Sequence, residues 1–227
     1  MAISLKDTAE LAQKKVNILA YGESGSGKTT AIKTLPCPVV LSAEGGLLSI
    51  SDAQIPYIEI KSVNDLLESY EWLISSDESK QFESVAIDSI SEIGEVLLAS
   101  EKKTAKDKRM AYGEMNDQIA EIVRNFRDIP NKHVYMTAKL DKTKDEMGRL
   151  LYAPSMPGSR SSQSLPYYFD ECLAFRSERD ENNHIKRAIM TSGDGLWMAK
   201  DRSGKLSTWE PMNLGALIEK IKGVQDV

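Results

Sequence analysis

Cysteine is scarce in this chain: two of its 227 residues, Cys37 and Cys172, are cysteines. They lie far apart and match no metal-binding spacing, which argues against a zinc site or a disulfide framework. We expect two buried, reduced thiols in a cytoplasmic protein. No apolar run approaches the length of a membrane span, and the first residues lack the apolar core of a signal peptide. We therefore expect a soluble protein with no membrane partner.

An excess of positive charge is also missing, because 29 Lys and Arg residues face 34 Asp and Glu residues, a formal net charge of −5. This balance excludes a surface that is positive throughout, although a local basic groove can still bind nucleic acid. Hydrophobic residues (41%) and charged residues (28%) lie in the ordinary globular range, which excludes wholesale disorder. The length suits one domain, which we place at residues 16–227 after an N-terminal extension at residues 1–15.

Short apolar runs alternate with segments of helical periodicity, which predicts an α/β fold with a mainly parallel central sheet flanked by helices. A polar stretch at 141–164, rich in Gly, Pro and Ser, is predicted as one long loop. After it, the runs FDECLAFR and IKRAIMTSG predict an antiparallel hairpin at the C-terminal edge of the sheet. The other expected strands are 16–21, 38–44, 55–60, 84–90 and 132–140, and the expected helices are 28–35, 62–74, 115–126 and 213–221.

One motif indicates the chemistry: GESGSGKTT fits the pattern G-x-x-x-x-G-K-[ST] between an apolar strand and a helix. Glycines let backbone N–H groups surround an anion, and the helix N-terminus adds positive charge. Lys28 should bridge the β- and γ-phosphates, and the Thr29 hydroxyl should bind Mg²⁺. The sequence therefore predicts binding of ATP with Mg²⁺, because an accidental glycine-rich turn is a poor alternative in this context. The expected binding residues are Gly22, Glu23, Ser24, Gly25, Ser26, Gly27, Lys28, Thr29 and Thr30.

Two acidic residues end other predicted strands. Asp88 closes the run VAID, where a carboxylate would hold the magnesium ion directly or through water. Its alternative role is a helix N-cap, since SISE follows. Glu44 closes VVLSAE and is our candidate for orienting the attacking water. Its alternative is a solvated glutamate before Gly45 and Gly46.

The order of these segments resembles the RecA-like ATPase core: GESGSGKTT, VVLSAE, VAIDSISEI and then VYMTAK. The short chain and the ending MAKDRSGKL…EPMNLGALIEKI look like the bacteriophage nucleotide-binding proteins, which act in recombination as single-strand annealing proteins. This resemblance implies an ATPase that binds single-stranded DNA in the host cytoplasm. It also implies a ring or filament of identical subunits and, as a further partner, a single-strand-binding protein.

The resemblance also implies roles for particular residues. It supports Glu44 as the residue that activates water, and it assigns sensing of the γ-phosphate to Thr137 and, after it, Lys139. Many RecA-like proteins have a glutamine at this sensing position, and none is evident here. Lys200 and Arg202 look like the basic pair that one subunit offers to the phosphates bound by the next. Without the resemblance they would be read as a solvated strand rim.

Two basic segments are candidates for DNA contact, at 101–109 and 141–164, with Tyr112 and Tyr152 near them as possible base-stacking residues. A solvated helix face and packed tyrosines are the alternatives. Two other functions stay open: a P-loop kinase with a lid bearing Arg149 and Arg160, and a nucleotide-gated module that does not hydrolyse ATP. The candidate DNA-binding residues are Lys102, Lys103, Lys106, Lys108, Arg109, Lys142, Lys144, Arg149 and Arg160.

Overall fold

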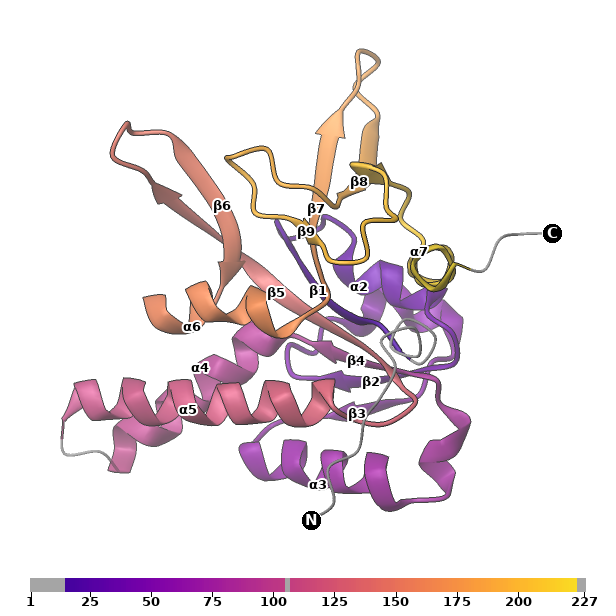
Figure 1. Cartoon of the computed structure of the whole chain (residues 1–227). Helices are drawn as coiled ribbons and strands as arrows, with labels where there is room; N and C mark the ends of the chain where they lie inside the picture. Colours follow the sequence, from indigo (N-terminus) through magenta and orange to yellow (C-terminus); the bar gives the residue numbers. More distant parts are fainter. Residues whose placement is uncertain (1–14, 105–106, 224–227) are drawn as a thin grey trace, which may run out of the picture.

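The computed structural model describes residues 15–104 and 107–223. The strands are β1 (Asn17–Gly22), β2 (Pro38–Ser42), β3 (Tyr57–Glu59), β4 (Ser84–Asp88), β5 (His133–Lys144), β6 (Leu150–Ser155), β7 (Glu171–Arg179), β8 (Ile185–Met190), β9 (Lys200–Asp201) and β10 (Trp209–Glu210). The helices are α2 (Lys28–Ala31), α3 (Val63–Ser75), α4 (Ile90–Thr104), α5 (Lys108–Arg127), α6 (Ser159–Ser164) and α7 (Leu214–Lys222). Figure 1 shows these elements around one central sheet.

The sheet is mainly parallel, and its strands follow the order β10–β8–β7–β1–β5–β4–β2–β3. β1 lies between β5 and β7 and is parallel to both, and β2, β3 and β4 continue this parallel arrangement. β8 is antiparallel to β7, and β10 is antiparallel to β8. The predicted α/β fold with a mainly parallel central sheet is therefore confirmed, including the antiparallel strands near the C-terminus.

Helices cover both faces of the sheet, as a mainly parallel sheet requires. Alternate residues of β1 face opposite ways: Leu19 and Tyr21 pack with α3, α4 and α5, whereas Ile18 and Ala20 pack with α2 and α7. Because successive side chains of a strand alternate, the apolar run of β1 builds two cores at once. β1 is fully buried as a result, and the loop that follows it has a rigid base.

The ends of two helices can be compared with their predictions. Ser62 caps α3 in a capping box with Asp65, as the sequence indicates. The helix expected at 28–35 is shorter: α2 ends at Ala31, and a 3-10 turn, Ile32–Thr34, takes its place. The chain is extended at Leu35, which is the conformation favoured by a residue before proline.

The long loop expected at 141–164 is wrong. β5 continues to Lys144, turns, and returns as β6, and the two strands form a twisted hairpin that projects from the sheet (Figure 1). Asp145 makes the turn, because its side chain accepts hydrogen bonds from the backbone N–H groups of Met147 and Arg149 at 2.9 and 2.8 Å. Gly148 supplies the positive φ of 78°. The segment then ends in α6.

The two cysteines also differ from each other. Cys172 is buried on β7, as expected, but Cys37 is exposed. Cys37 lies in a tight turn between Pro36 and Pro38 with a φ of 37°, so it stands at the surface before β2 begins. No helix in the described part of the chain is both long enough and apolar enough to cross a bilayer.

Candidate functional site

The glycine-rich loop leaves the carboxyl end of β1 and leads into α2. At Gly22, an added Cβ would lie 2.4 Å from the carbonyl oxygen of Phe175 on β7, so no larger residue fits. Gly27 has a φ of 98°, a left-handed conformation that glycine adopts at little cost. Tyr135 on β5 anchors the start of α2, because its hydroxyl donates to the carbonyl of Lys28 at 2.9 Å. The loop is thus held open around its own backbone N–H groups.

Lys28 lies across this loop. Its Nζ donates to the carbonyl oxygens of Gly22 and Glu23 at 2.8 and 3.0 Å. Burial lowers the pKa of Lys28, while the carboxylates of Asp88 and Glu44 act in the opposite direction. A half-buried ammonium with only neutral hydrogen-bond partners is stabilised further when an anion binds beside it.

Asp88 connects three elements beneath the loop. Its carboxylate accepts a hydrogen bond of 2.8 Å from the Thr29 hydroxyl of α2 and another from the Thr137 hydroxyl of β5. The side chain is 3% exposed. A hydroxyl oxygen and a carboxylate oxygen at this spacing are ligands that suit Mg²⁺, so the residues present fit that ion. The N-cap alternative for Asp88 is not seen, because the hydroxyl of Ser89 accepts from the N–H of Glu92 instead.

Glu44 follows β2 and lies on the same side of the sheet. The backbone N–H groups of Ala43 and Glu44 donate to the carbonyl of Asp88 at 2.8 and 3.2 Å, which ties the end of β2 to the end of β4. The Ser89 hydroxyl also donates to the Glu44 carboxylate. The carboxyl ends of three parallel strands therefore bring Lys28, Asp88 and Glu44 around one cleft.

The cleft has a volume of about 1350 Å³. Besides the loop, Asp88 and Glu44, four further cations line it: Lys33, Lys139, Lys142 and Arg187. Lys139 makes ion pairs with Glu92 and Glu95 of α4 at 2.8 and 2.9 Å. Lys142, a candidate for DNA contact, lies here because its Nζ pairs with Glu23 of the loop at 2.6 Å.

The other DNA candidates lie outside this cleft. Lys102, Lys103 and Arg109 are exposed where α4 and α5 meet. Lys106 lies outside the described residues, as does the side chain of Lys108. Lys144 is exposed near the tip of the β5–β6 hairpin, and Arg149 pairs with Asp145 at 2.7 Å in its turn.

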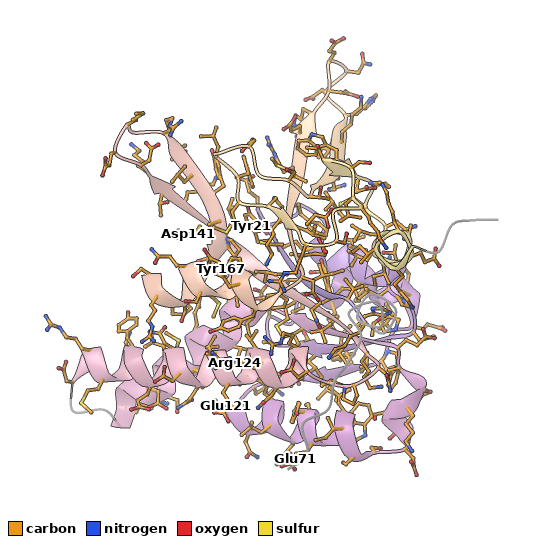
Figure 2. All side chains as sticks on the ribbon, viewed as in Figure 1. Tyr21, Glu71, Glu121, Arg124, Asp141 and Tyr167 are labelled. Carbon is orange, nitrogen blue, oxygen red and sulfur yellow. The ribbon has the colours of Figure 1, made fainter. Side chains whose placement is uncertain are left out.

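Arg160 lines a second cavity, of about 410 Å³, between α5 and the segment of α6 and the turn after it. Arg124 and Glu121 of α5 line the same cavity, and Figure 2 places them below Tyr167, which lies on that turn. Arg124 stands over the ring of Tyr168 at 5.1 Å. This cavity is separate from the nucleotide-side cleft.

The two tyrosines considered for base stacking are engaged with their own chain. The ring of Tyr152 stacks on Trp197 with centroids 4.2 Å apart. Lys102 Nζ stands 5.2 Å from the ring centre of Tyr112. Tyr112 is the more exposed of the two, at 37%.

Lys200 and Arg202 lie away from the glycine-rich loop of their own chain. Lys200 stands opposite Cys172, which is level with Leu19 in β1, before the loop begins. Its Nζ donates to the carbonyls of Pro166 and Phe169 at 2.7 and 2.6 Å. Arg202 pairs with Asp170 at 3.1 Å, and its side chain remains 55% exposed. Neither residue is among those that line the cleft of the same chain.

Sequence reasoning missed Arg187 of β8 and Met212, which lies between β10 and α7. Both line the cleft, although no motif marks either one. The signal is the antiparallel pairing of β8 with β7 and of β10 with β8, which brings the C-terminal segment next to the loop after β1. That pairing requires a register that the amino-acid pattern alone does not fix.

One family model matches most of the chain. The model of the AAA domain family matches residues 14–203, which include every residue of the cleft except Met212. No curated protein matches the sequence. Among solved structures, a KaiC-like protein from the hyperthermophilic archaeon Pyrococcus horikoshii OT3 is similar, with 14% identity, 78% of each chain covered and a TM-score of 0.40.

Proposed function

This chain belongs to the AAA domain family and carries a P-loop that binds nucleoside triphosphates, and we propose that it hydrolyses ATP and couples this reaction to single-stranded DNA. The observation that carries the ATPase proposal is the Thr29–Asp88–Thr137 set beneath the P-loop. Two strands and a helix converge there on one buried carboxylate. A purely structural turn has no need of a carboxylate held by two hydroxyls beside a half-buried lysine.

The residues of the cleft divide the chemistry of hydrolysis among them. The P-loop N–H groups and Lys28 would hold the phosphates, and Lys28 would offset the charge that grows on the γ-phosphate. Glu44 would orient the attacking water and accept its proton. Thr29 and Asp88 would hold Mg²⁺, which supplies charge neutralisation and polarises the phosphate oxygens.

Binding of DNA is supported by where the basic segments lie. The β5–β6 hairpin and the α4–α5 pair both project from the same side of the molecule in Figure 1. The exposed cations at their ends include Lys144, Lys102, Lys103 and Arg109. Such separated cations suit contact with a phosphate backbone, and salt should weaken this contact because it depends on those local charges.

A role in annealing or recombination, within an assembly of identical subunits, follows from the resemblance to phage RecA-like proteins. In such an assembly Arg202, which is exposed and lies outside the cleft of its own chain, would exchange its ion pair with Asp170 for the nucleotide bound by a neighbour. Its guanidinium would then stabilise the charge on the transferred phosphoryl group. The kinase alternative has less support, because Arg149 and Arg160 do not line the cleft in the described part of the chain.

The test is ATP turnover with and without single-stranded DNA, at low and at moderate salt, with Lys28→Ala as the blank. We expect turnover in the wild type that DNA stimulates, with a stimulation that fades as salt rises. If DNA does not change the rate of ATP turnover, the proposed coupling to DNA is wrong and the protein is an ATPase without it. Glu44→Gln separates hydrolysis from binding, because this variant should keep its affinity for ATP and lose ATP turnover. If the wild type binds ATP but has no more turnover than Glu44→Gln, with or without DNA, the protein is a nucleotide-gated module.

A further inference from the structure

Arg187 is a cation without an acidic partner beside the P-loop. Its neighbours in the β7–β8 hairpin are paired: Arg176 with Glu178 at 2.6 Å, and Lys186 with Asp180 at 3.5 Å. In the described residues no carboxylate pairs with Arg187, whose Nε donates to the carbonyl of Gly25 at 3.3 Å. The terminal amino groups of its guanidinium are therefore available to a ligand.

Met212 meets Arg187 over the same part of the loop. An added Cβ on Gly27 would lie 2.8 Å from the Met212 Cε and 3.4 Å from the Arg187 Cδ. The methionine is held there from both sides. β10, just before it, pairs with β8, and the N–H of Leu214, just after it, donates to the Thr34 hydroxyl at 2.8 Å.

The orientation of the P-loop decides which half of a nucleotide reaches this pair. Lys28 reaches the β- and γ-phosphates, while Thr29 and Asp88 lie at the magnesium side of the cleft. The nucleoside must leave in the other direction, past the start of α2. There the cleft continues along Thr30, Lys33 and Thr34 to Arg187 and Met212.

Two of the other polar side chains on this side are already engaged. Lys33 pairs with Asp52. The Thr34 hydroxyl donates to the carbonyl of Ala31 at 2.7 Å as well as accepting from Leu214. Beside the Thr30 hydroxyl, a planar guanidinium and a thioether line this side of the cleft. Both favour the face of an aromatic ring: the guanidinium through cation–π stacking, and the sulfur through contact with the ring.

We propose that Arg187 and Met212 form a nucleoside clamp, which covers the face of the base and holds it beside the P-loop. The inference rests on the proposed nucleotide site and names the part of it that binds the base. A clamp that contacts the face of a ring reads few of its edge atoms. We therefore expect it to raise affinity for purine nucleotides in general more than it selects one base.

The experiment measures the affinities of ATP, ADP and inorganic tripolyphosphate, each with Mg²⁺, by calorimetry. Arg187→Ala should weaken ATP and ADP by the same factor, roughly three- to thirtyfold, and leave tripolyphosphate unchanged. Arg187→Lys should lose nearly as much nucleotide affinity, because lysine keeps the positive charge but lacks the planar guanidinium group. Met212→Ala should weaken the two nucleotides by a smaller factor and should likewise leave tripolyphosphate unchanged.

Lys186→Ala is the matched control, since Lys186 lies next to Arg187 on β8 and is paired with Asp180. It should bind all three ligands as the wild type does. An equal loss of tripolyphosphate in Arg187→Ala, or full rescue by lysine, would make Arg187 a phosphate ligand and overturn the clamp. Unchanged nucleotide affinity in both Arg187→Ala and Met212→Ala would overturn it as well. Failure of the wild type to bind ATP would instead overturn the nucleotide site itself.

Discussion

The ammonium group of Lys142 lies 2.6 Å from the carboxylate of Glu23, and this ion pair joins the β5–β6 hairpin to the P-loop. Lys142 also stands 5.9 Å from the ring centre of Tyr152, which stacks on Trp197. A change at the P-loop thus has a direct route into the hairpin.

Lys142→Ala should therefore uncouple DNA from ATP turnover. We expect DNA stimulation to fall to near the DNA-free rate, while ATP affinity stays within about threefold of the wild type, because Lys28 and the P-loop N–H groups are untouched. Turnover at saturating DNA, divided by turnover without DNA, measures this. Fluorescence of Trp197, in a chain whose other two tryptophans are replaced by phenylalanine, reports whether ATP still alters the hairpin.

Lys144→Ala is the control, because Lys144 lies on the same strand face two residues nearer the tip. It should weaken DNA binding but leave full stimulation once DNA is saturating. Identical losses of stimulation in the two variants would show that position 142 acts only as another DNA contact.

Thr137→Val should impair use of magnesium. Valine has nearly the shape of threonine but cannot donate to Asp88, so the carboxylate loses one of the two hydroxyls that orient it. Loss of such an orienting hydrogen bond typically costs about 10- to 100-fold in metal affinity or activity. We expect a higher Mg²⁺ concentration for half-maximal turnover, measured by titration. Thr143→Val, on the exposed hairpin, should titrate as the wild type does, and an unshifted Mg²⁺ curve for Thr137→Val would separate Thr137 from the metal.

Lys200→Ala and Arg202→Ala should differ in kind. Removing Lys200 leaves the carbonyls of Pro166 and Phe169 without their donor, which should cost about 1–3 kcal/mol of folding free energy. Arg202→Ala should unfold close to the wild-type temperature and yet lose turnover, if the guanidinium acts on the nucleotide of a neighbouring subunit as we propose. Thermal unfolding and turnover of each variant separate these effects.

Mixing two inactive variants tests directly whether Arg202 acts on the site of a neighbouring subunit. Lys28→Ala has a defective P-loop but an intact Arg202, and Arg202→Ala is the reverse. In an assembly with a shared site, a mixture should recover part of the turnover that each lacks alone. Mixtures with no more turnover than the separate variants would mean that Arg202 does not act across an interface.

The part of the site that follows directly from sequence is the part encoded by neighbouring residues. The P-loop is a local motif, and Asp88 and Glu44 stand at the ends of apolar runs that are typical of buried parallel strands. Strands of that kind bring their carboxyl ends to one edge of the sheet, so these residues had to lie near one another.

The rest depends on pairing between distant strands. The hairpin at 141–155 was missed because its polar outer residues, Asp141 to Lys144, mask a pattern that the structure stabilises through β6 and Asp145. Arg187 and Met212 were missed because only the register of β7, β8 and β10 brings them to the P-loop. Lys142 was placed with the DNA contacts, whereas its partner, Glu23, lies more than a hundred residues earlier.

The last prediction concerns the pH dependence of stability and rests on the acidic residues Glu171 and Asp201. Glu171 of β7 is fully buried opposite Asp201 of β9. Burial, and then the charge of Asp201, raise the pKa of Glu171 to about 8. Asp201 keeps its charge because hydrogen bonds from Ser203, Leu206 and Gly204 lower its pKa against the effect of burial.

The sign follows from linkage. The folded protein binds a proton at Glu171 that the unfolded chain releases near its ordinary pKa, so the native state holds more protons between about pH 4.5 and about pH 8. The contribution of Glu171 to stability is therefore fully present below this window and is lost as the pH rises through it. Glu171→Gln mimics the protonated acid and titrates nowhere. Its melting temperature should equal that of the wild type near pH 4.5 and exceed it by about 5 °C or more at pH 8.5. A difference between the two proteins that does not change with pH would mean that Glu171 is ionised throughout.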